Sequence, residues 1–455
     1  MEIQIDPKNQ CRGGLAAIGR SKLVLRSIFV LLVAAVLAAV LTAGVVIGRS
    51  RIRFGFLTRA RLVVKDVRDV VNGNWSGPVS VERLYIDIGV EELDELASAR
   101  KAALERGTLY GVPQRYLDAT IRYQGKTVPV GLRLKGGGAG SHLAGSKWSM
   151  RVKVRQSNAV LGMTNFALMD PKMRNMALEW LLRRIMGEEG LVSKRYRFVA
   201  VTINGVNRGI YAMDEHYTSA MLAHNERRPS PIIRLNQEPI WYSAAAGGPR
   251  FTNNYGQDDF YYTTDVNAVG MKNELDNPVF VANYERAVQR FEAFRSGKAA
   301  THEVFDVLKL AKMMAGSDLM GAWHGLRVNN VRFYYNPFTD RLEPAPDDGF
   351  STDGFPTIFR RVSHRHIFRL NDHGATGAFL RTLFADPVMT EAYIRELERI
   401  TDPSHLRALL AKHQLDLDHN VRILQRDYPE YVFPKDVLYD VQRQLRKLVN
   451  PFRGA

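Results

Sequence analysis

The sequence predicts an α+β protein whose first half is rich in strands and whose second half is helical, with a cleft between two lobes. Three observations lead to this prediction. The segment KWSMRVKV, residues 147–154, alternates polar and apolar side chains as a half-buried strand does. The segment RFVAVTINGVNRGIYAMDE, residues 197–215, holds two apolar runs around an Asn-Gly pair, which is preferred in tight hairpin turns. From residue 277 onward, helix signals dominate the chain.

The expected elements follow this division. In the first half we expect strands over 81–89, 117–125, 127–136 and 147–154, and helices over 90–106 and about 171–186. Residues 226–275 are rich in Gly, Pro, Asn, Tyr and Asp, and we interpret this long irregular segment as a lid or a binding loop. After it we expect a helix from 277, an aromatic hairpin over 329–350, and helices over 387–400, 403–412 and 435–448.

The N-terminal region predicts attachment to a membrane. Residues 27–48 carry no charge and are long enough to cross about 30 Å of hydrocarbon as a helix. The run is too long for a signal-peptide core, so we expect an uncleaved single-pass transmembrane helix. A basic tail, 1–26, precedes it and a basic juxtamembrane linker, 49–75, follows it, so charge alone leaves the orientation open. A signal-anchor would place the remaining domain, 76–455, outside the cytoplasmic membrane.

Composition bounds the partners of the protein. With 45% hydrophobic and 24% charged residues, the 455-residue chain is typical of a globular protein. Its formal charge of +16 favours anionic partners such as nucleotides, phosphorylated polymers or membrane surfaces. Nucleic-acid binding is disfavoured, because we find no zinc-ligand spacing, RNP-like aromatic motif or basic repeat. The single cysteine, Cys11, excludes a disulfide within the chain and a cysteine-based zinc site.

The aromatic hairpin NNVRFYYNPFTDRLEPAPDDGF, residues 329–350, has amides at one open end and carboxylates at the other. Ordinary turn chemistry explains such residues. They are also the ligand types of a hard divalent cation that carries phosphates. Under the second interpretation, Asn330, Asp347 and Asp348 bind Mg²⁺ or Mn²⁺.

A glycine-rich basic segment, residues 133–154, offers a phosphate-binding site. Glycines let backbone N–H groups approach phosphates closely, and Lys135, Lys147 and Arg151 supply positive charge. The pattern matches neither a Walker A loop nor a kinase glycine-rich loop. A flexible hairpin with solvated basic residues explains the segment about as well.

Four further residues are candidates for phosphoryl-transfer chemistry. Glu215 ends the Asn-Gly hairpin, and Glu179 lies among apolar residues on a predicted helix. Either could hold a lysine against nucleotide phosphates, as a glutamate does in kinases. Asp318 and His324 could accept or orient the attacking hydroxyl, although a buried histidine and a helix-face aspartate are as often structural.

Several motifs in a fixed order resemble the spore coat protein H (CotH) kinase family. They are RLKG, KWSMRVK, NGVNRGIYAMDE and the aromatic hairpin, and the resemblance spans residues 81–354. It implies a two-lobed atypical protein-kinase-like fold, ATP, a divalent metal and phosphate transfer to protein serine or threonine. By the matched motifs, Lys135 and Lys147 fall on the nucleotide side, Glu215 is the acid after the hairpin, and Asn330 with Asp348, or Asp347, holds the metal.

The chain departs from the family pattern in two places. It has PAPDDG where the family often shows Pro-Trp-Asp-x-Asp, and His324 where many members have an aspartate. Two functions are therefore predicted. The first is a membrane-anchored bacterial kinase acting on a protein or another cell-envelope acceptor. The second is a catalytically inactive kinase-like scaffold that binds an anionic envelope polymer or a partner protein.

Overall fold

The computed structural model describes residues 79–449, except for residues 157, 247–257, 272–273, 275 and 352–373. The described residues belong to one compact unit, Pro78–Ala455. The predicted transmembrane helix, 27–48, and its basic flanks lie outside the described residues. Within the described ranges, no helix has both the length and the apolar character needed to cross a bilayer.

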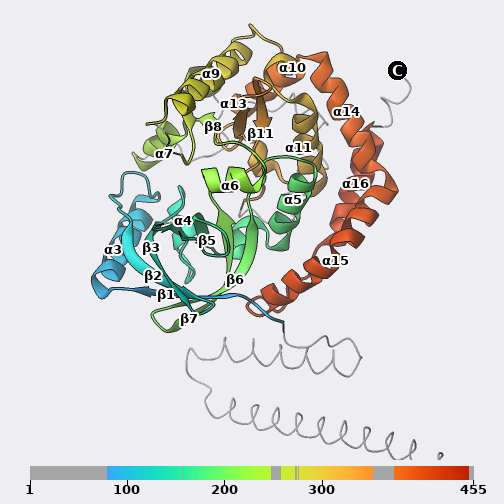
Figure 1. Ribbon diagram of the computed structural model, residues 1–455. Helices are drawn as coiled ribbons and strands as arrows, with labels where there is room; N and C mark the ends of the chain where they lie inside the picture. Colours follow the sequence, from blue (N-terminus) through green and yellow to red (C-terminus); the bar gives the residue numbers. More distant parts are fainter. Residues whose placement is uncertain are drawn as a thin grey trace, which may run out of the picture. The chain divides into compact units, whose positions relative to one another are not determined.

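Seven strands form a closed barrel in the order β1-β2-β3-β4-β5-β7-β6 (Figure 1). They are β1 (Arg83–Ile88), β2 (Leu117–Tyr123), β3 (Lys126–Leu134), β4 (Met150–Val154), β5 (Asn165–Met169), β6 (Tyr196–Ile203) and β7 (Val206–Glu215). All neighbours are antiparallel except β1 and β6, whose parallel pairing closes the barrel. The predicted alternation is confirmed in β4, where Met150, Val152 and Val154 are buried in the barrel core and Lys153 is exposed.

The β6–β7 hairpin turns at the predicted Asn204-Gly205 pair. Both residues have positive φ, 46° and 77°, which this pair adopts at low cost. The Asn204 side chain also accepts from the backbone N–H of Ile88 and donates to its carbonyl, each at 2.9 Å. These bonds fasten the hairpin tip to β1 and help to fix the register of the barrel.

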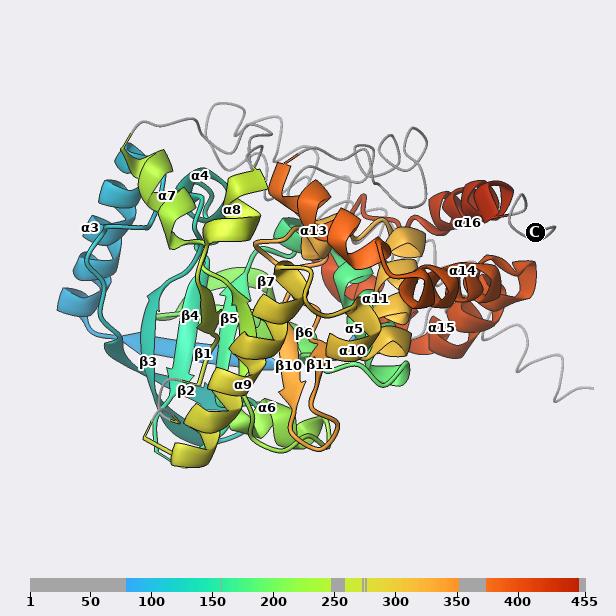
Figure 2. The same cartoon turned by 90° about the horizontal axis from the view of Figure 1, so that it is seen from above.

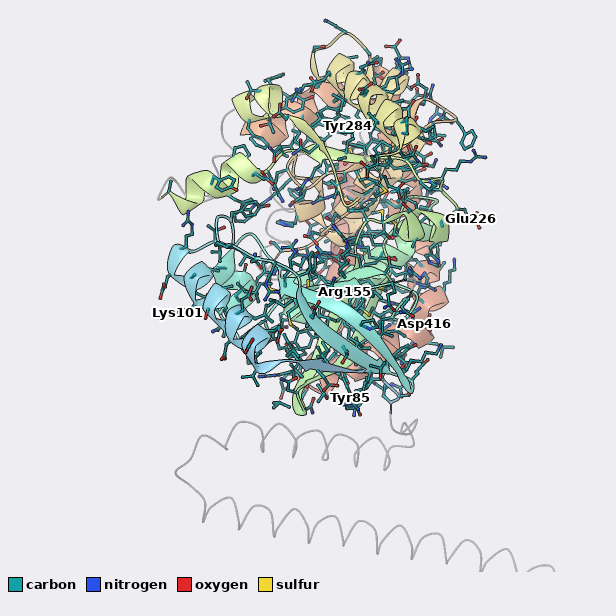
Figure 3. The ribbon with its side chains drawn as sticks, turned by 60° about the vertical axis from the view of Figure 1, so that its left-hand side comes forward. Tyr85, Lys101, Arg155, Glu226, Tyr284 and Asp416 are labelled. Carbon is teal, nitrogen blue, oxygen red and sulfur yellow. The ribbon has the colours of Figure 1, made fainter. Side chains whose placement is uncertain are left out.

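Two helices of the first half flank the barrel. Helix α3 (Val90–Arg106) covers its outside, and Lys101 on α3 and Tyr85 on β1 project outward (Figure 3). Helix α5 (Ala177–Glu188) is buried on almost every face and belongs to the same apolar core as β6 and α11 (Val307–Met320). A short 3-10 turn, η1 (Pro171–Arg174), precedes α5. Helix α5 therefore lies between the barrel and the helical part of the domain.

The second half contains more strand than predicted. The aromatic hairpin is confirmed as β10 (Phe333–Asn336) and β11 (Arg341–Pro344), but it belongs to a four-stranded sheet of order β11-β10-β8-β9. The partner strands, β8 (Ile232–Leu235) and β9 (Val266–Ala268), come from the segment predicted to be irregular. Aromatic side chains of β10 pack against neighbouring helices, which explains why the hairpin is buried in a sheet and does not protrude as a loop.

Helices account for most of the remainder of the domain. They are α4 (Ala139–Leu143), α6 (Ser219–His224), α7 (Glu238–Ala245), α8 (Asp258–Thr263), α9 (Pro278–Arg295), α10 (Thr301–Val304), η3 (Trp323–Leu326), α13 (Gly374–Phe384), α14 (Pro387–Thr401), α15 (Pro403–Gln425) and α16 (Lys435–Val449). The predicted start of α9 is confirmed, since the Asn277 side chain accepts from the N–H of Val279 at 3.0 Å. Helix α15 runs 13 residues past its predicted end. Helices α14, α15 and α16 lie on the side of the domain away from α3 (Figure 2).

Candidate functional site

Strand β7 sends its side chains alternately to two environments. Ile210 and Ala212 belong to the core shared with the helices, whereas Tyr211 and Met213 belong to the barrel core. By this alternation Asp214 faces the helical part and Glu215 does not. Glu215 was predicted as a residue that could hold a lysine. It binds Arg195, accepting from the backbone N–H of Arg195 at 3.0 Å and from its Nε at 2.9 Å. Among the residues described, Glu215 therefore holds an arginine and no lysine.

Three carboxylates meet at the end of β7. Oxygen atoms of Asp214, Asp347 and Asp348 lie within 4.8 Å of one another. The last two follow β11, so the β6–β7 hairpin and the aromatic hairpin bring the group together from distant parts of the chain. We call these three residues the carboxylate group. Two of its members, Asp347 and Asp348, were predicted from the sequence, and Asp214 was not.

Buried cations surround Asp214 and Asp347. Lys194 Nζ lies 3.0 Å from Oδ1 of Asp214 and also contacts Asp347. Arg332 Nη2 lies 3.1 Å from Oδ2 of Asp347, and Arg183 Nη2 lies 3.7 Å from Oδ1 of the same carboxylate. Burial alone would raise the pKa of Asp347, but the charges of Arg332 and Lys194 outweigh it and hold that pKa well below its ordinary value. Asp347 is therefore ionised in the folded protein.

Asp348 has its own partner and a strained backbone. Its Oδ2 accepts from Nη2 of Arg174 at 2.5 Å. Burial would raise the pKa of Asp348, but the charges of Arg174 and Lys135 lower it well below the usual range. Its φ is +31°, in a region that non-glycine residues rarely adopt. Strain of this kind concentrates at functional sites, because surrounding contacts must maintain it.

Lys135 lies at the end of β3, where the glycine-rich segment begins. Partial burial lowers its pKa to about 8, and the nearby charge of Asp348 opposes that shift. Within the described ranges, its ammonium has no hydrogen-bond or ion-pair partner in the protein. This lysine is thus a half-buried donor beside the carboxylate group.

The glycine-rich segment packs closely against two side chains. A Cβ at Gly136 would lie 2.2 Å from the His142 ring, and one at Gly137 would lie 2.2 Å from the Trp241 ring. Trp241, on α7, stacks on Tyr110 with ring centroids 5.6 Å apart and planes inclined by 6°. The glycines are therefore required by close approach, and an aromatic pair lies directly over the segment.

Glu179 and Arg183 connect α5 to the carboxylate group. Glu179 Oε1 lies 2.6 Å from Nη2 of Arg183 and accepts from the N–H of Gly349 at 3.3 Å. Burial raises the pKa of Glu179, and Arg183 opposes the rise. Arg183 also donates to the carbonyl of Pro346. Glu179 therefore positions the backbone on both sides of the two aspartates, through Arg183 and through Gly349.

The predicted basic residues Lys147 and Arg151 differ in their distance from the carboxylate group. Lys147 lies outside the carboxylate group, because its ammonium donates to Asp427 and to the carbonyl of Ile210, each at 2.7 Å, and to the Tyr428 hydroxyl at 2.9 Å. Arg151 lies nearer. Burial lowers its pKa, and the charges of Asp214 and Asp347 oppose that change.

Of the three remaining candidates, His324 and Asn330 lie near the carboxylate group and Asp318 does not. His324 donates its backbone N–H to the carbonyl of Gly349 at 3.1 Å, and Asn330 Nδ2 donates to the carbonyl of His324 at 3.0 Å. Both residues therefore adjoin the segment that carries Asp348. Asp318 accepts a hydrogen bond from the hydroxyl of Tyr393, between α11 and α14. That contact ties Asp318 to helix packing.

Four cations of the site were not predicted from the sequence: Arg174, Arg183, Lys194 and Arg332. One signal could have identified Lys194. It lies two residues before Tyr196, the first residue of β6, which pairs with Asp214 across the hairpin, and an extended chain before the strand would put all three on one face. The arginines come from η1, α5 and the start of the aromatic hairpin, and no local pattern relates them.

The carboxylate group fits a hard divalent cation in ligand type, since such ions take carboxylate oxygens. Lys194 and Arg174 already neutralise these oxygens. A metal would therefore compete with both cations for the same oxygens.

Comparison with known proteins agrees with the resemblance seen in the motifs. A family model described as CotH kinase protein matches residues 132–413, which is more than half of the chain. No curated protein matches the chain. The matched region contains the glycine-rich segment, α5, both hairpins and all three members of the carboxylate group.

Proposed function

Because this chain belongs to the CotH kinase protein family, we propose that it transfers phosphate from ATP to protein serine or threonine, or to another acceptor of the cell envelope, with Mg²⁺ or Mn²⁺. The barrel and the helical part would be the two lobes of a kinase-like fold. The observation that carries this proposal is the carboxylate group with a half-buried lysine, Lys135, beside it. Carboxylates and a lysine around phosphates and metal are the recurring parts of phosphoryl transfer.

In this proposal each side chain has a distinct task. Asp348 and Asp214 supply oxygen ligands, and a divalent ion bound there would neutralise charge on the phosphate oxygens. Lys135 donates to phosphate, because its ammonium has no partner among the described residues. Arg174 orients Asp348 through the 2.5 Å bond. His324 orients the acceptor hydroxyl in preference to Asp318, because His324 bonds to Gly349, next to Asp348.

Further parts of the proposal concern the surroundings of the site. The glycine-rich segment, with Tyr110 and Trp241 over it, would hold the nucleotide. Residues 27–48 would anchor the protein in the cytoplasmic membrane, with the domain outside it. The net charge of +16 fits an anionic nucleotide and an anionic envelope acceptor.

One observation favours the alternative of an inactive scaffold. Each member of the carboxylate group already has a cationic partner, and Lys147 is bound elsewhere. A site neutralised by its own side chains can be stable without metal. A scaffold of this kind would bind an anionic polymer or a partner protein through its basic surface and would turn over no ATP.

The deciding experiment uses the purified full chain with γ-labelled ATP and Mg²⁺ or Mn²⁺. Label is followed on the protein itself and on casein as a generic acceptor. We expect metal-dependent labelling that Asp348→Ala abolishes and that Asp118→Ala, an exposed aspartate paired with Arg155, leaves intact. Absence of labelling with calorimetric ATP binding would favour the scaffold. Absence of both would refute a nucleotide function.

A further inference from the structure

Three arginines near the carboxylate group have no acid partner in the described part of the chain. Arg133 is on β3, Arg151 on β4 and Arg234 on β8, and all three side chains are half-buried. The Nε of Arg234 is fully buried and has no hydrogen-bond partner among the described residues. A half-buried, unpaired cation is unfavourable, because it loses part of its hydration and gains no counter-charge. Such an arrangement is expected where an anion binds.

Arg133 and Arg151 lie side by side on the outer face of the barrel. They are opposite each other across β3 and β4. Arg151 is also opposite Ala167 on β5, which in turn is opposite Asp214 on β7. Side chains directly opposite each other in antiparallel strands share a face, with Cβ atoms about 5 Å apart. The two arginines therefore stand in one row with Asp214, and Arg133 also lies over the ring of Tyr116, 5.2 Å from its centroid.

Arg234 approaches the same place from the four-stranded sheet. On β8 it shares a face with Ile232, two residues earlier, and Ile232 packs in one apolar cluster with Tyr217, just after β7. This face of the sheet is therefore turned toward the end of β7. The register between β8 and β10, continued by one residue, sets Arg234 opposite Arg332, which binds Asp347. Arg234 thus lies beside the carboxylate group, on the side of the sheet.

Electrostatic effects agree with this placement. Burial lowers the pKa of Arg151 and that of Arg234, and in each case the charge of Asp347 opposes the fall. Burial raises the pKa of Tyr110, and the charges of Arg234 and Arg133 oppose that rise. The Tyr110 hydroxyl therefore lies between arginines of the barrel and of the sheet. Among the described residues, its proton has no acceptor.

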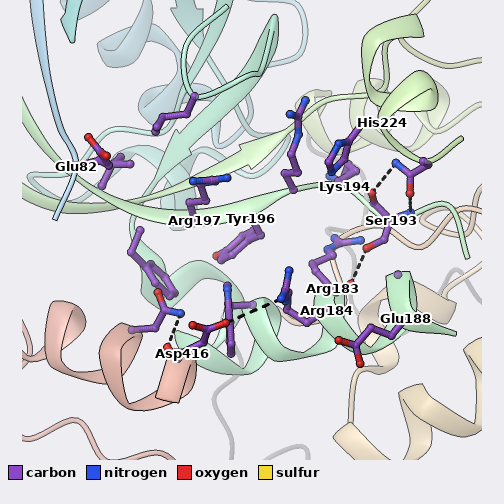
Figure 4. Close-up of a pocket in the computed structure, with 18 of the residues that line it drawn as sticks. Glu82, Arg183, Arg184, Glu188, Ser193, Lys194, Tyr196, Arg197, His224 and Asp416 are labelled. Atoms are coloured by element: carbon purple, nitrogen blue, oxygen red, sulfur yellow. Dashed lines mark hydrogen bonds and ion pairs between the residues drawn. The ribbon is translucent and has the colours of Figure 1, made fainter. Parts of the chain in front are cut away.

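The other charges of the site balance without these three arginines. Lys194 lies 3.0 Å from Asp214, and Arg183 on α5 lies 2.6 Å from Glu179; Figure 4 shows both cations. In all, four acids face four cations: Asp214, Asp347, Asp348 and Glu179 face Lys194, Arg332, Arg174 and Arg183. The three arginines, together with Lys135, are therefore a positive surplus beside a neutral cluster.

We propose that Arg133, Arg151 and Arg234 bind a second phosphate group of the phosphate donor, next to the phosphate that Lys135 would bind. The guanidinium groups would donate to its oxygens from the barrel and from the sheet, and the Tyr110 hydroxyl would add a neutral donor. The planar fork of an arginine matches the oxygens of a phosphate. This inference rests on the proposed phosphate transfer, and it adds that the site selects a polyphosphate as the donor.

The test uses inorganic tripolyphosphate, titrated calorimetrically without metal into the full chain against a detergent blank. This probe has no nucleoside, so its binding reports the phosphate contacts alone. We expect saturable binding, and at least tenfold weaker binding of orthophosphate, which fills one position only. Arg151→Met and Arg234→Met should each weaken tripolyphosphate about tenfold, because each removes a charge-assisted hydrogen bond. Arg341→Met, at an exposed position of β11 in the same sheet as Arg234, is the matched control and should change nothing.

Urea midpoints distinguish binding from a structural role. Arg151 and Arg234 have no acid partner to lose, so both variants should unfold at the native midpoint or above it. Equal binding of the two probes, an equal loss in Arg341→Met, or a loss accompanied by lower midpoints would overturn the inference. Unchanged tripolyphosphate affinity with a raised KM for casein would also overturn it and would assign the arginines to the acceptor. Arginine-dependent tripolyphosphate binding without any labelling from ATP would support the second phosphate position and refute the transfer, so the two failures are distinguishable.

Discussion

The ammonium of Lys147 lies 2.7 Å from Oδ2 of Asp427, 280 residues later in the chain. The same carboxylate oxygen accepts from the backbone N–H of Ile210, and a Cβ at Gly209 would lie 2.1 Å from it. This cluster joins the barrel to the end of α15. The Lys147 side chain is 13% exposed, so the pair is only weakly screened by solvent.

Lys147→Met should therefore affect stability and leave ATP affinity intact. Loss of a charged, partly buried hydrogen-bond network should lower the free energy of unfolding by about 2 kcal/mol. Urea denaturation measures the first effect and calorimetric titration with ATP and Mg²⁺ the second. Arg155→Met, which breaks only an exposed pair with Asp118, is the control and should cost less than about 1 kcal/mol. A large loss of ATP affinity in Lys147→Met would return this lysine to the nucleotide site.

Asp214 and Glu215 are neighbours with different predicted roles. Asp214→Asn should abolish labelling from ATP, because it removes one oxygen of the carboxylate group. Glu215→Gln should leave labelling within a few-fold of the native level and lower stability, because it weakens the bonds to Arg195. Labelling assays and urea midpoints of both variants give the comparison. If Glu215→Gln were inactive and Asp214→Asn active, the assignment of Asp214 to the site and of Glu215 to a structural role would be wrong.

Replacement of Asp347 should lower the free energy of unfolding more than replacement of Asp348. Asp347→Asn removes the charge facing Lys194, Arg332 and Arg183, and leaving buried cations uncompensated costs about 3–5 kcal/mol. Asp348→Asn leaves Arg174 with a neutral acceptor at a position 20% exposed, and about 1–3 kcal/mol is expected. Both should lose activity. Equal urea midpoints for the two variants would contradict the assignment of Asp347 as the structural centre of the charges.

ATP affinity should fall as pH rises through about 8. The pKa of Lys135 lies near 8 in the folded protein, below its ordinary value of 10.5, so the ammonium loses its proton first in the folded state. Its charge therefore costs stability below about pH 8, and this cost is relieved between about 8 and 10.5. Phosphate binding needs the charged form, and we expect about tenfold weaker ATP binding at pH 9 than at pH 7. Calorimetry across this range should show the change in the native protein and none in Lys135→Met.

Gly137→Ala tests the approach of Trp241 to the glycine-rich segment. The added Cβ would lie 2.2 Å from the indole ring, so α7 or the segment must move. We expect weaker ATP binding measured by calorimetry. Gly140→Ala is the matched control, because a Cβ there meets nothing within 4 Å, and it should bind ATP as the native chain does. Identical affinity in the two variants would show that this contact does not shape the nucleotide site.

The sequence predicted local elements more reliably than their partners. The β6–β7 hairpin and the start of α9 were confirmed, and the strand predicted over 147–154 was confirmed over Met150–Val154, because each depends on neighbouring residues such as Asn204-Gly205. The sheet partners of the aromatic hairpin were missed, since β8 lies about 100 residues earlier in a segment without strand periodicity.

For the site, the sequence by itself determined that Asp347, Asp348 and Lys135 belong to motifs of one family. Only the tertiary structure decided that Asp214 completes the carboxylate group and that Glu215 faces Arg195. It also decided that Lys147 pairs with Asp427. The physical reason is that both neighbours at the end of β7 are acids and both faces of that strand are buried, so the local pattern cannot tell them apart. Ion pairs between distant residues are fixed by the packing of the barrel against the helices, which leaves no periodic trace in the sequence.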